Sequence, residues 1–123
     1  MRTTPKHVLI AEDDKFLAGI VGRFLSEHGL QVTIAHDGRE TVEAIEKTKP
    51  HLLLLDILLP VLDGHGVLKA IKEKKVDCPV IVMSNLSDKR IKQRCKEMRV
   101  KAYFVKSDLD EASLLPAIKR YMR

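Results

Sequence analysis

The sequence predicts an α/β protein in which a five-stranded parallel sheet is covered by helices on both faces. Five short strand-like segments recur along the chain, and segments of helical periodicity separate them. Strict alternation of strands and helices implies right-handed connections and a parallel sheet. Because the 123 residues contain no linker, repeat or low-complexity segment, we expect one domain over residues 1–123, with no output domain.

Four of the strand-like segments are apolar runs, which indicates strands buried on both faces. These runs cover residues 8–11, 52–55, 80–83 and 102–105. Residues 31–35 instead alternate polar and apolar side chains, so this segment is expected to be a half-exposed strand at an edge of the sheet.

The first three helical segments each pair an apolar stripe with a recognisable boundary. The stripe of the first comprises Leu17, Ile20, Val21, Phe24 and Leu25. Gly29 follows it as a natural end of the helix. The second begins near Asp37 and ends before Pro50, and the third begins after Asp63 and closes in the charged residues 72–75.

The last two helical segments differ in charge. The fourth lies between Asp88 and Lys101, is strongly basic, and turns Ile91, Cys95 and Met98 toward the core. The fifth covers residues 108–121. Either Ser107 or Asp108 is expected to cap it.

The net charge of +5 is concentrated in the second half of the chain. Residues 1–60 carry 7 basic and 9 acidic side chains (−2), whereas residues 61–123 carry 15 and 8 (+7). Most of this excess lies in the basic helix, which permits an acidic partner protein or nucleic acid but is more simply a solvated helix face. No aromatic residue interleaves the basic ones, which argues against nucleic acid as a partner.

The cellular setting follows from what the chain lacks. Its first apolar run has only four residues and an acidic triplet follows it, so nothing resembles a signal peptide. No run approaches the roughly 18 apolar residues of a membrane span. We therefore expect a soluble, cytoplasmic protein without a membrane partner, in which Cys78 and Cys95 are packed thiols.

All four apolar runs end at an acid, a hydroxyl or an amine, namely Glu12 and Asp13, Asp56, Ser84, and Lys106. The carboxyl ends of parallel strands meet at one edge of a sheet, and the flavodoxin-like strand order 2-1-3-4-5 places strands 1 and 3 side by side there. Three carboxylates brought close together repel one another unless a cation offsets their charge. Mg²⁺ prefers such oxygen ligands, so we expect a magnesium site.

The same residues suit phosphoryl transfer. The Asp56 carboxylate is a suitable nucleophile toward phosphorus, the Lys106 ammonium can neutralise the phosphoryl oxygens, and the Ser84 hydroxyl can donate to one of them. Each residue alone has a plainer explanation. Asp13 or Asp14 can cap the first helix, Asp56 can simply end a strand, Ser84 can cap or turn, and Lys106 can lie on the surface. Their joint occurrence at four strand ends favours the phosphoryl site.

At these residues the chain resembles a receiver domain of the two-component response-regulator family, and the resemblance covers its full length. The matching features are the acidic pair within residues 8–14, Asp56 with residues 57–60 and the following Asp63 and Gly64, the stretch 35–40, and Ser84 followed 22 residues later by Lys106.

The resemblance implies a specific reaction. Asp56 takes a phosphoryl group from a phosphohistidine of a sensor histidine kinase or phosphotransfer protein. Mg²⁺ is held by Asp13, Asp56 and the backbone carbonyl of Leu58, while Glu12 acts largely through bound water. Such a domain promotes only its own phosphorylation and dephosphorylation and is not otherwise an enzyme.

The resemblance also implies a switch. Ser84 moves toward the phosphoryl group and Tyr103 turns inward behind it. The responsive surface is then formed by the fourth helix, the fifth strand and the fifth helix. Its partners are a downstream target protein, a fused output domain absent from this chain, or a second phosphorylated copy.

The chain departs from the family pattern at two positions. Ser107 stands where proline usually follows the lysine, and the hydrophobic Leu58 stands two residues after the acceptor. Together with Leu86, Leu58 is expected to hinder the water that hydrolyses the acyl phosphate, which predicts a long-lived phosphorylated state.

Other functions fit the residues less well. A phosphohydrolase of the aspartyl-phosphate type needs a second acid at position 58, and a flavodoxin-like cofactor binder needs a phosphate loop where the acidic triplet stands. A receiver-like module that binds proteins without being phosphorylated is the serious alternative.

Overall fold

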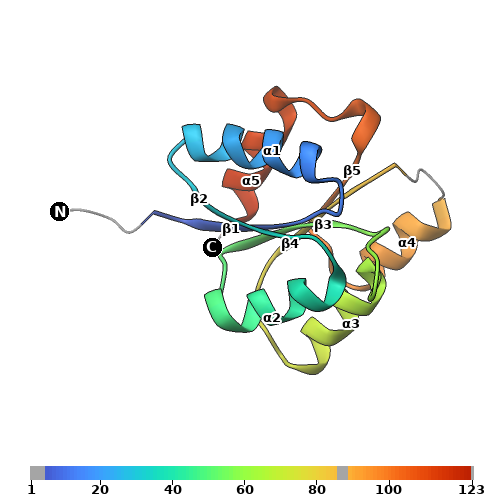
Figure 1. Cartoon of the computed structure of the whole chain (residues 1–123). Helices are drawn as coiled ribbons and strands as arrows, with labels where there is room; N and C mark the ends of the chain where they lie inside the picture. Colours follow the sequence, from blue (N-terminus) through green and yellow to red (C-terminus); the bar gives the residue numbers. More distant parts are fainter. Residues whose placement is uncertain (1–4, 86–88, 123) are drawn as a thin grey trace.

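A computed structural model of the chain describes residues 5–85 and 89–122, and it contains the predicted alternation of strands and helices (Figure 1). The strands are β1 His7–Ala11, β2 Gln31–Ala35, β3 Leu52–Asp56, β4 Val80–Ser84 and β5 Ala102–Val105. The helices are α1 Lys15–Glu27, α2 Gly38–Thr48, α3 Gly64–Glu73, α4 Lys89–Glu97 and α5 Glu111–Tyr121, with a 3₁₀ turn at Lys106–Asp108.

The strands form one parallel sheet in the order β2-β1-β3-β4-β5, which confirms the predicted topology. The alternating strand β2 lies at one edge and is only partly buried, as expected. The central strands β3 and β4 are buried at every position, because helices cover both of their faces. The apolar strand β5 was also predicted to be buried, but it is only partly buried because it lies at the other edge of the sheet.

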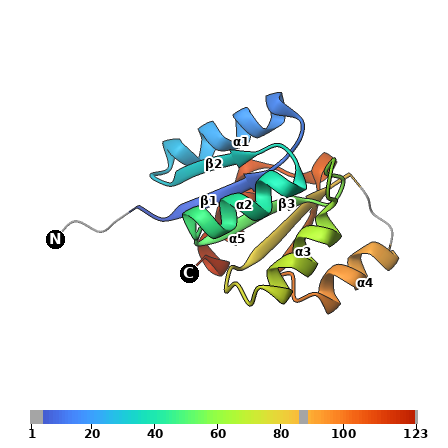
Figure 2. The same cartoon turned by 60° about the horizontal axis from the view of Figure 1, so that its bottom comes forward.

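The helices are divided between the two faces of the sheet. Helices α1 and α5 lie on one face, and α2, α3 and α4 lie on the other (Figures 1 and 2). Successive strand residues point to opposite faces, so Leu9 and Leu53 pack with α2, α3 and α4 whereas Ile10 and Leu54 pack with α1 and α5. Each face therefore has its own apolar core.

Strand register brings the polar strand ends to a common edge. Ala11 is opposite Leu55, and Asp56 is opposite Met83. Ser84 is in turn opposite Val105, the residue before Lys106. The chain therefore leaves β1, β3, β4 and β5 at nearly the same level of the sheet.

Aspartate caps fix where three helices begin beside this edge. Asp14 accepts hydrogen bonds from the backbone N–H groups of the first turn of α1. Asp37 and Asp63 do the same for α2 and α3. Of the two acids that the sequence offered as a cap for α1, the structure uses Asp14 and leaves Asp13 for other contacts.

Three sequence predictions about helices need correction. Helix α5 begins at Glu111 rather than at residue 108, and its cap is Asp110 instead of Ser107 or Asp108, because the chain first makes the 3₁₀ turn. Ile20 is 49% exposed, since it lies at the solvent side of the α1 stripe. Helix α4 ends at Glu97, earlier than predicted.

Several predictions on single residues have a plain outcome. Cys78 and Cys95 are buried thiols, and neither forms a disulfide within the described residues, as expected. Among the described residues, no helix has the length and apolar character that a bilayer crossing requires. Leu86, which was expected to hinder hydrolysis of the acyl phosphate together with Leu58, lies outside the described residues.

Candidate functional site

Three carboxylates converge at the carboxyl edge of the sheet. Glu12 and Asp13 follow β1, Asp56 ends β3, and one oxygen from each lies within 4.8 Å of the others. Glu12 and Asp56 are almost fully buried, whereas Asp13 is exposed at the mouth of the cluster. The predicted convergence of these three acids is therefore confirmed.

Lys106 reaches into the same cluster from the 3₁₀ turn after β5. Its ammonium donates a hydrogen bond of 2.8 Å to Asp56 Oδ2 and also forms an ion pair with Glu12 Oε1. Its side chain is only 12% exposed. Lys106 is thus not a surface lysine, and it offsets part of the charge of the acids.

Burial and charge act against each other at this site. Burial raises the pKa of the Glu12 carboxyl, and neighbouring Asp56 adds to that rise, while Lys106 opposes it. For Lys106, burial alone would lower the pKa of the ammonium. The hydrogen bonds and charges of Asp56 and Glu12 outweigh burial and raise that pKa instead.

The donor set suits a hard divalent cation. All three acids offer oxygen atoms, and the Lys106 ammonium pairs with two of them, Glu12 and Asp56. The buried Oε1 atom of Glu12 has the Lys106 ammonium as its partner. Mg²⁺ takes carboxylate oxygens together with waters and phosphate oxygens, so Glu12, Asp13 and Asp56 fit its requirements.

Local backbone holds the Asp56 side chain in place. The Leu58 N–H donates to Asp56 Oδ1 at 3.0 Å, leaving Oδ2 to Lys106. Helix α3 starts against this loop, and the Gly64 N–H donates to the Ile57 carbonyl at 2.8 Å. A Cβ on Gly64 would lie 2.6 Å from the Ile57 Cα, so only glycine allows this approach.

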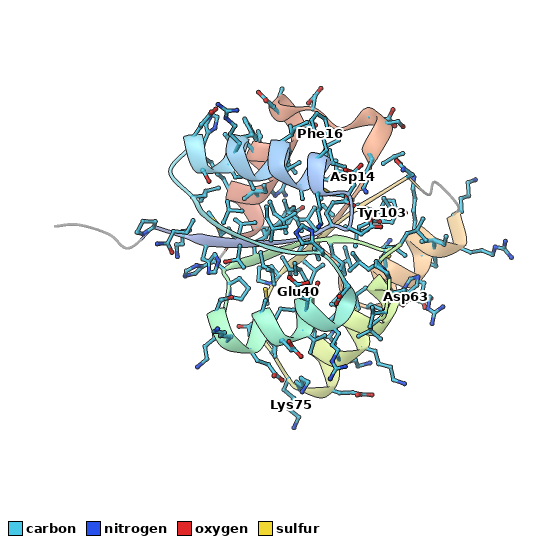
Figure 3. All side chains as sticks on the ribbon, in the orientation of Figure 1. Asp14, Phe16, Glu40, Asp63, Lys75 and Tyr103 are labelled. Atoms are coloured by element: carbon cyan, nitrogen blue, oxygen red, sulfur yellow. The ribbon has the colours of Figure 1, made fainter. Side chains whose placement is uncertain are left out.

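The two predicted switch residues lie on β4 and β5. Ser84 is fully buried at the end of β4. Tyr103 is half-buried on β5 (Figure 3). The Lys92 ammonium of α4 lies 5.7 Å from the centre of the Tyr103 ring. Leu58 is 54% exposed, beside the acids.

A contact between His36 and the backbone of Glu12 was not predicted from the sequence. The His36 Nδ1 lies 3.1 Å from the backbone carbonyl oxygen of Glu12, and because a carbonyl only accepts, this nitrogen donates the proton. The Glu12 N–H in turn donates to the Ala35 carbonyl at 2.9 Å. The loop after β1 is therefore fastened to the end of β2.

Comparison with known proteins agrees with this site. The model of the response regulator receiver domain family matches residues 8–119. The transcriptional regulatory protein PdtaR of Mycobacterium tuberculosis is 33% identical over 94% of this chain and 56% of its own length. Response regulator RR06 of Streptococcus pneumoniae is 39% identical over 67% of this chain and 37% of its own length. The chain thus spans about half or less of these curated relatives.

Solved structures show the same fold. The receiver domain of RstA from Klebsiella pneumoniae, activated by BeF₃, is 25% identical and superposes with a TM-score of 0.89 over 96% of this chain and 99% of that domain. A CheY-like receiver domain protein from Methanospirillum hungatei is 27% identical, with a TM-score of 0.87 over 95% of this chain and 93% of the other.

Proposed function

The chain belongs to the response regulator receiver domain family, and from that premise we propose that Asp56 accepts a phosphoryl group in a Mg²⁺-dependent reaction. The donor is a histidine kinase or phosphotransfer protein, the partners with which receiver domains of this family interact. One observation carries the proposal. Three acids from two strands and the Lys106 ammonium from a third element meet around the Asp56 carboxylate.

The chemistry is a transfer between two nucleophiles. An oxygen of Asp56 attacks phosphorus, the bond from phosphorus to the histidine nitrogen breaks, and an acyl phosphate forms. Asp13, Asp56 and the Leu58 carbonyl would hold Mg²⁺, with Glu12 acting through water, and the ion would lower repulsion between the carboxylate and the incoming phosphoryl group. Lys106 already contacts Asp56 Oδ2 and neutralises charge on the phosphoryl oxygens.

Phosphorylation adds about one negative charge and new acceptor oxygens at Asp56. We propose that the buried Ser84 hydroxyl moves to donate to one of these oxygens and that Tyr103 follows it inward. The Lys92 contact with the Tyr103 ring supports this idea, because it ties α4 to β5. The responsive face is then α4, β5 and α5, which signals by protein contact.

The remaining elements of the proposal concern partners and setting. Phe16 and Ile20 on α1 are exposed apolar side chains close in sequence to the acidic cluster, and they offer contact area to a donor protein. Phosphorylation also permits a second copy of the chain as a partner. The protein acts in the cytoplasm and catalyses only its own phosphorylation and dephosphorylation.

Acetyl phosphate with Mg²⁺ tests the proposal through the intact mass of the protein. The wild-type chain should gain one phosphoryl group, Asp56→Asn should gain none, and Asp37→Asn, which alters the cap of α2, should react like wild type. If wild type stays unmodified, or Asp56→Asn is modified equally, the proposed reaction is wrong. A chain that also fails to respond to beryllofluoride with Mg²⁺ would then be a protein-binding module that is not phosphorylated.

A further inference from the structure

A cleft lies at the opposite edge of the sheet from the acidic cluster. It has a volume of about 590 Å³ and lies where α3 and α4 end and β4 begins. Lys75, at the lower edge of Figure 3, is one of its lining residues. Its volume falls within the range of roughly 300–1,000 Å³ typical of small-molecule sites.

The cleft combines apolar walls with a cationic rim. Six apolar residues line it, namely Leu68, Ile71, Val76, Pro79, Val80 and Met98. The rim carries four cations, Lys72, Lys75, Arg99 and Lys101, against two acids, Asp77 and Glu97. None of these four cationic side chains forms an ion pair or hydrogen bond with a residue in the described part of the chain, unlike neighbouring Lys74, which pairs with Glu46 at 2.6 Å.

The backbone at two of the cations is unusual. Lys75 and Arg99 have φ angles of 54° and 64°, the left-handed conformation that favours glycine. Each lies within a closing turn at the end of its helix, in which the Val76 N–H donates to the Ile71 carbonyl and the Val100 N–H donates to the Cys95 carbonyl, both at 3.1 Å. Glycine is the usual residue at such a helix end, yet both positions carry a long cation.

The helix dipole does not by itself account for these two residues. A cation near the end of a helix is favourable, but the last turn of α3 already holds Lys72 and that of α4 holds Arg94 and Lys96. Lys75 and Arg99 therefore add positive charge beyond what the helix ends need, at positions where the backbone disfavours them. Both line the same cleft.

We propose that this cleft binds a small amphipathic anion, a molecule with a carboxylate or phosphate group on an apolar body. The apolar body fills the space between Ile71, Val76 and Met98, and the anionic group lies against Lys75 and Arg99. The cleft and the acidic cluster share no residue, so this site does not depend on the phosphoryl chemistry proposed for Asp56.

Glycine substitution separates charge from folding at these positions. Lys75→Gly with Arg99→Gly removes both cations while supplying the residue that the left-handed backbone prefers, so thermal unfolding should be unchanged or occur at higher temperature. Lys49→Gly is the matched control. Lys49 has a φ of 48° at the end of α2 but does not line the cleft.

The probe is 2-naphthoate, titrated without Mg²⁺ and followed by amide shifts in ¹H–¹⁵N spectra. We expect shifts at Val76 and Val100, a dissociation constant raised about fivefold or more in the double variant, and an unchanged constant in Lys49→Gly. Neutral 2-naphthol should bind more weakly than 2-naphthoate, and acetate should not bind. Absence of these shifts, equal binding by the double variant, or equal binding of 2-naphthol would overturn the proposal.

Discussion

Replacement of Lys106 by methionine tests how strongly the stability of the folded chain depends on the ammonium in the acidic cluster. The methionine keeps most of the unbranched stem and removes only the charge and the hydrogen bonds. In wild type the ammonium pairs with Glu12 and with Asp56 Oδ2, and all three side chains are nearly enclosed. The variant therefore leaves two buried carboxylates without their cation.

The expected loss is large. Removing one partner of a buried ion pair costs about 3–5 kcal/mol, because the remaining charge stays buried and unpaired. Lys106 keeps 12% of its side chain exposed, and Asp13 opens toward solvent, so we take the lower end of that range. A loss of about 3 kcal/mol corresponds to a melting temperature roughly 10 °C lower for a domain of this size.

Urea unfolding followed by far-UV circular dichroism is a suitable assay, because the chain has no tryptophan. The buffer contains EDTA so that no divalent ion replaces the ammonium, and added Mg²⁺ should then narrow the difference from wild type. The control is Lys69→Met, which breaks a pair of 4.0 Å with Glu73 at the exposed surface and should cost at most about 0.5 kcal/mol. Equal losses in the two variants would refute the reasoning.

Three other perturbations have defined outcomes. Burial, aided by the charge of His51, lowers the pKa of His7. As pH falls, the unfolded chain therefore takes up the proton before the folded chain does, so the free energy of unfolding should be full above about pH 6.5 and decrease below it. His7→Gln should show a smaller decrease; an equal shift of the urea midpoint with pH in wild type and variant would count against this. Gly64→Ala should lower the free energy of unfolding in urea by about 2 kcal/mol, because its Cβ would clash with Ile57. Gly19→Ala, whose Cβ would have nothing within 4 Å, should raise it by up to about 1 kcal/mol, and similar changes in the two variants would contradict the close approach of Gly64 to Ile57. Phosphorylated Leu58→Asn should lose its phosphoryl group severalfold faster than wild type. An unchanged rate would show that Leu58 does not hinder the water that hydrolyses the acyl phosphate.

The site was predictable because it depends on topology more than on detailed packing. Parallel strands end at the same edge of a sheet, so topology places Glu12 and Asp13 after β1, Asp56 at the end of β3 and Lys106 after β5 at one edge. Their chemistry, carboxylates beside an ammonium, then assigns them to one site. The same reasoning places Ser84 at the correct edge, and its movement toward a phosphoryl group stays a prediction.

Other features depend on contacts that a local pattern does not contain. Asp108 and Asp110 are both acceptable caps in sequence, and Asp110 caps α5 because the preceding turn is used to bring Lys106 to the acids. The bond between His36 and the Glu12 carbonyl joins residues 24 apart and has no sequence signature. Ile20 lies at the margin of a helical stripe, where periodicity does not decide burial.

Binding of Mg²⁺, measured by calorimetry, tests most directly whether the strand-end acids form one cation site. Wild type should bind a single ion, and Asp13→Asn and Asp56→Asn should each weaken binding about tenfold or more, since each removes a charged oxygen ligand. Asp37→Asn, which alters an aspartate outside the cluster, should bind as wild type does. Equal affinity in wild type and Asp56→Asn would contradict the account.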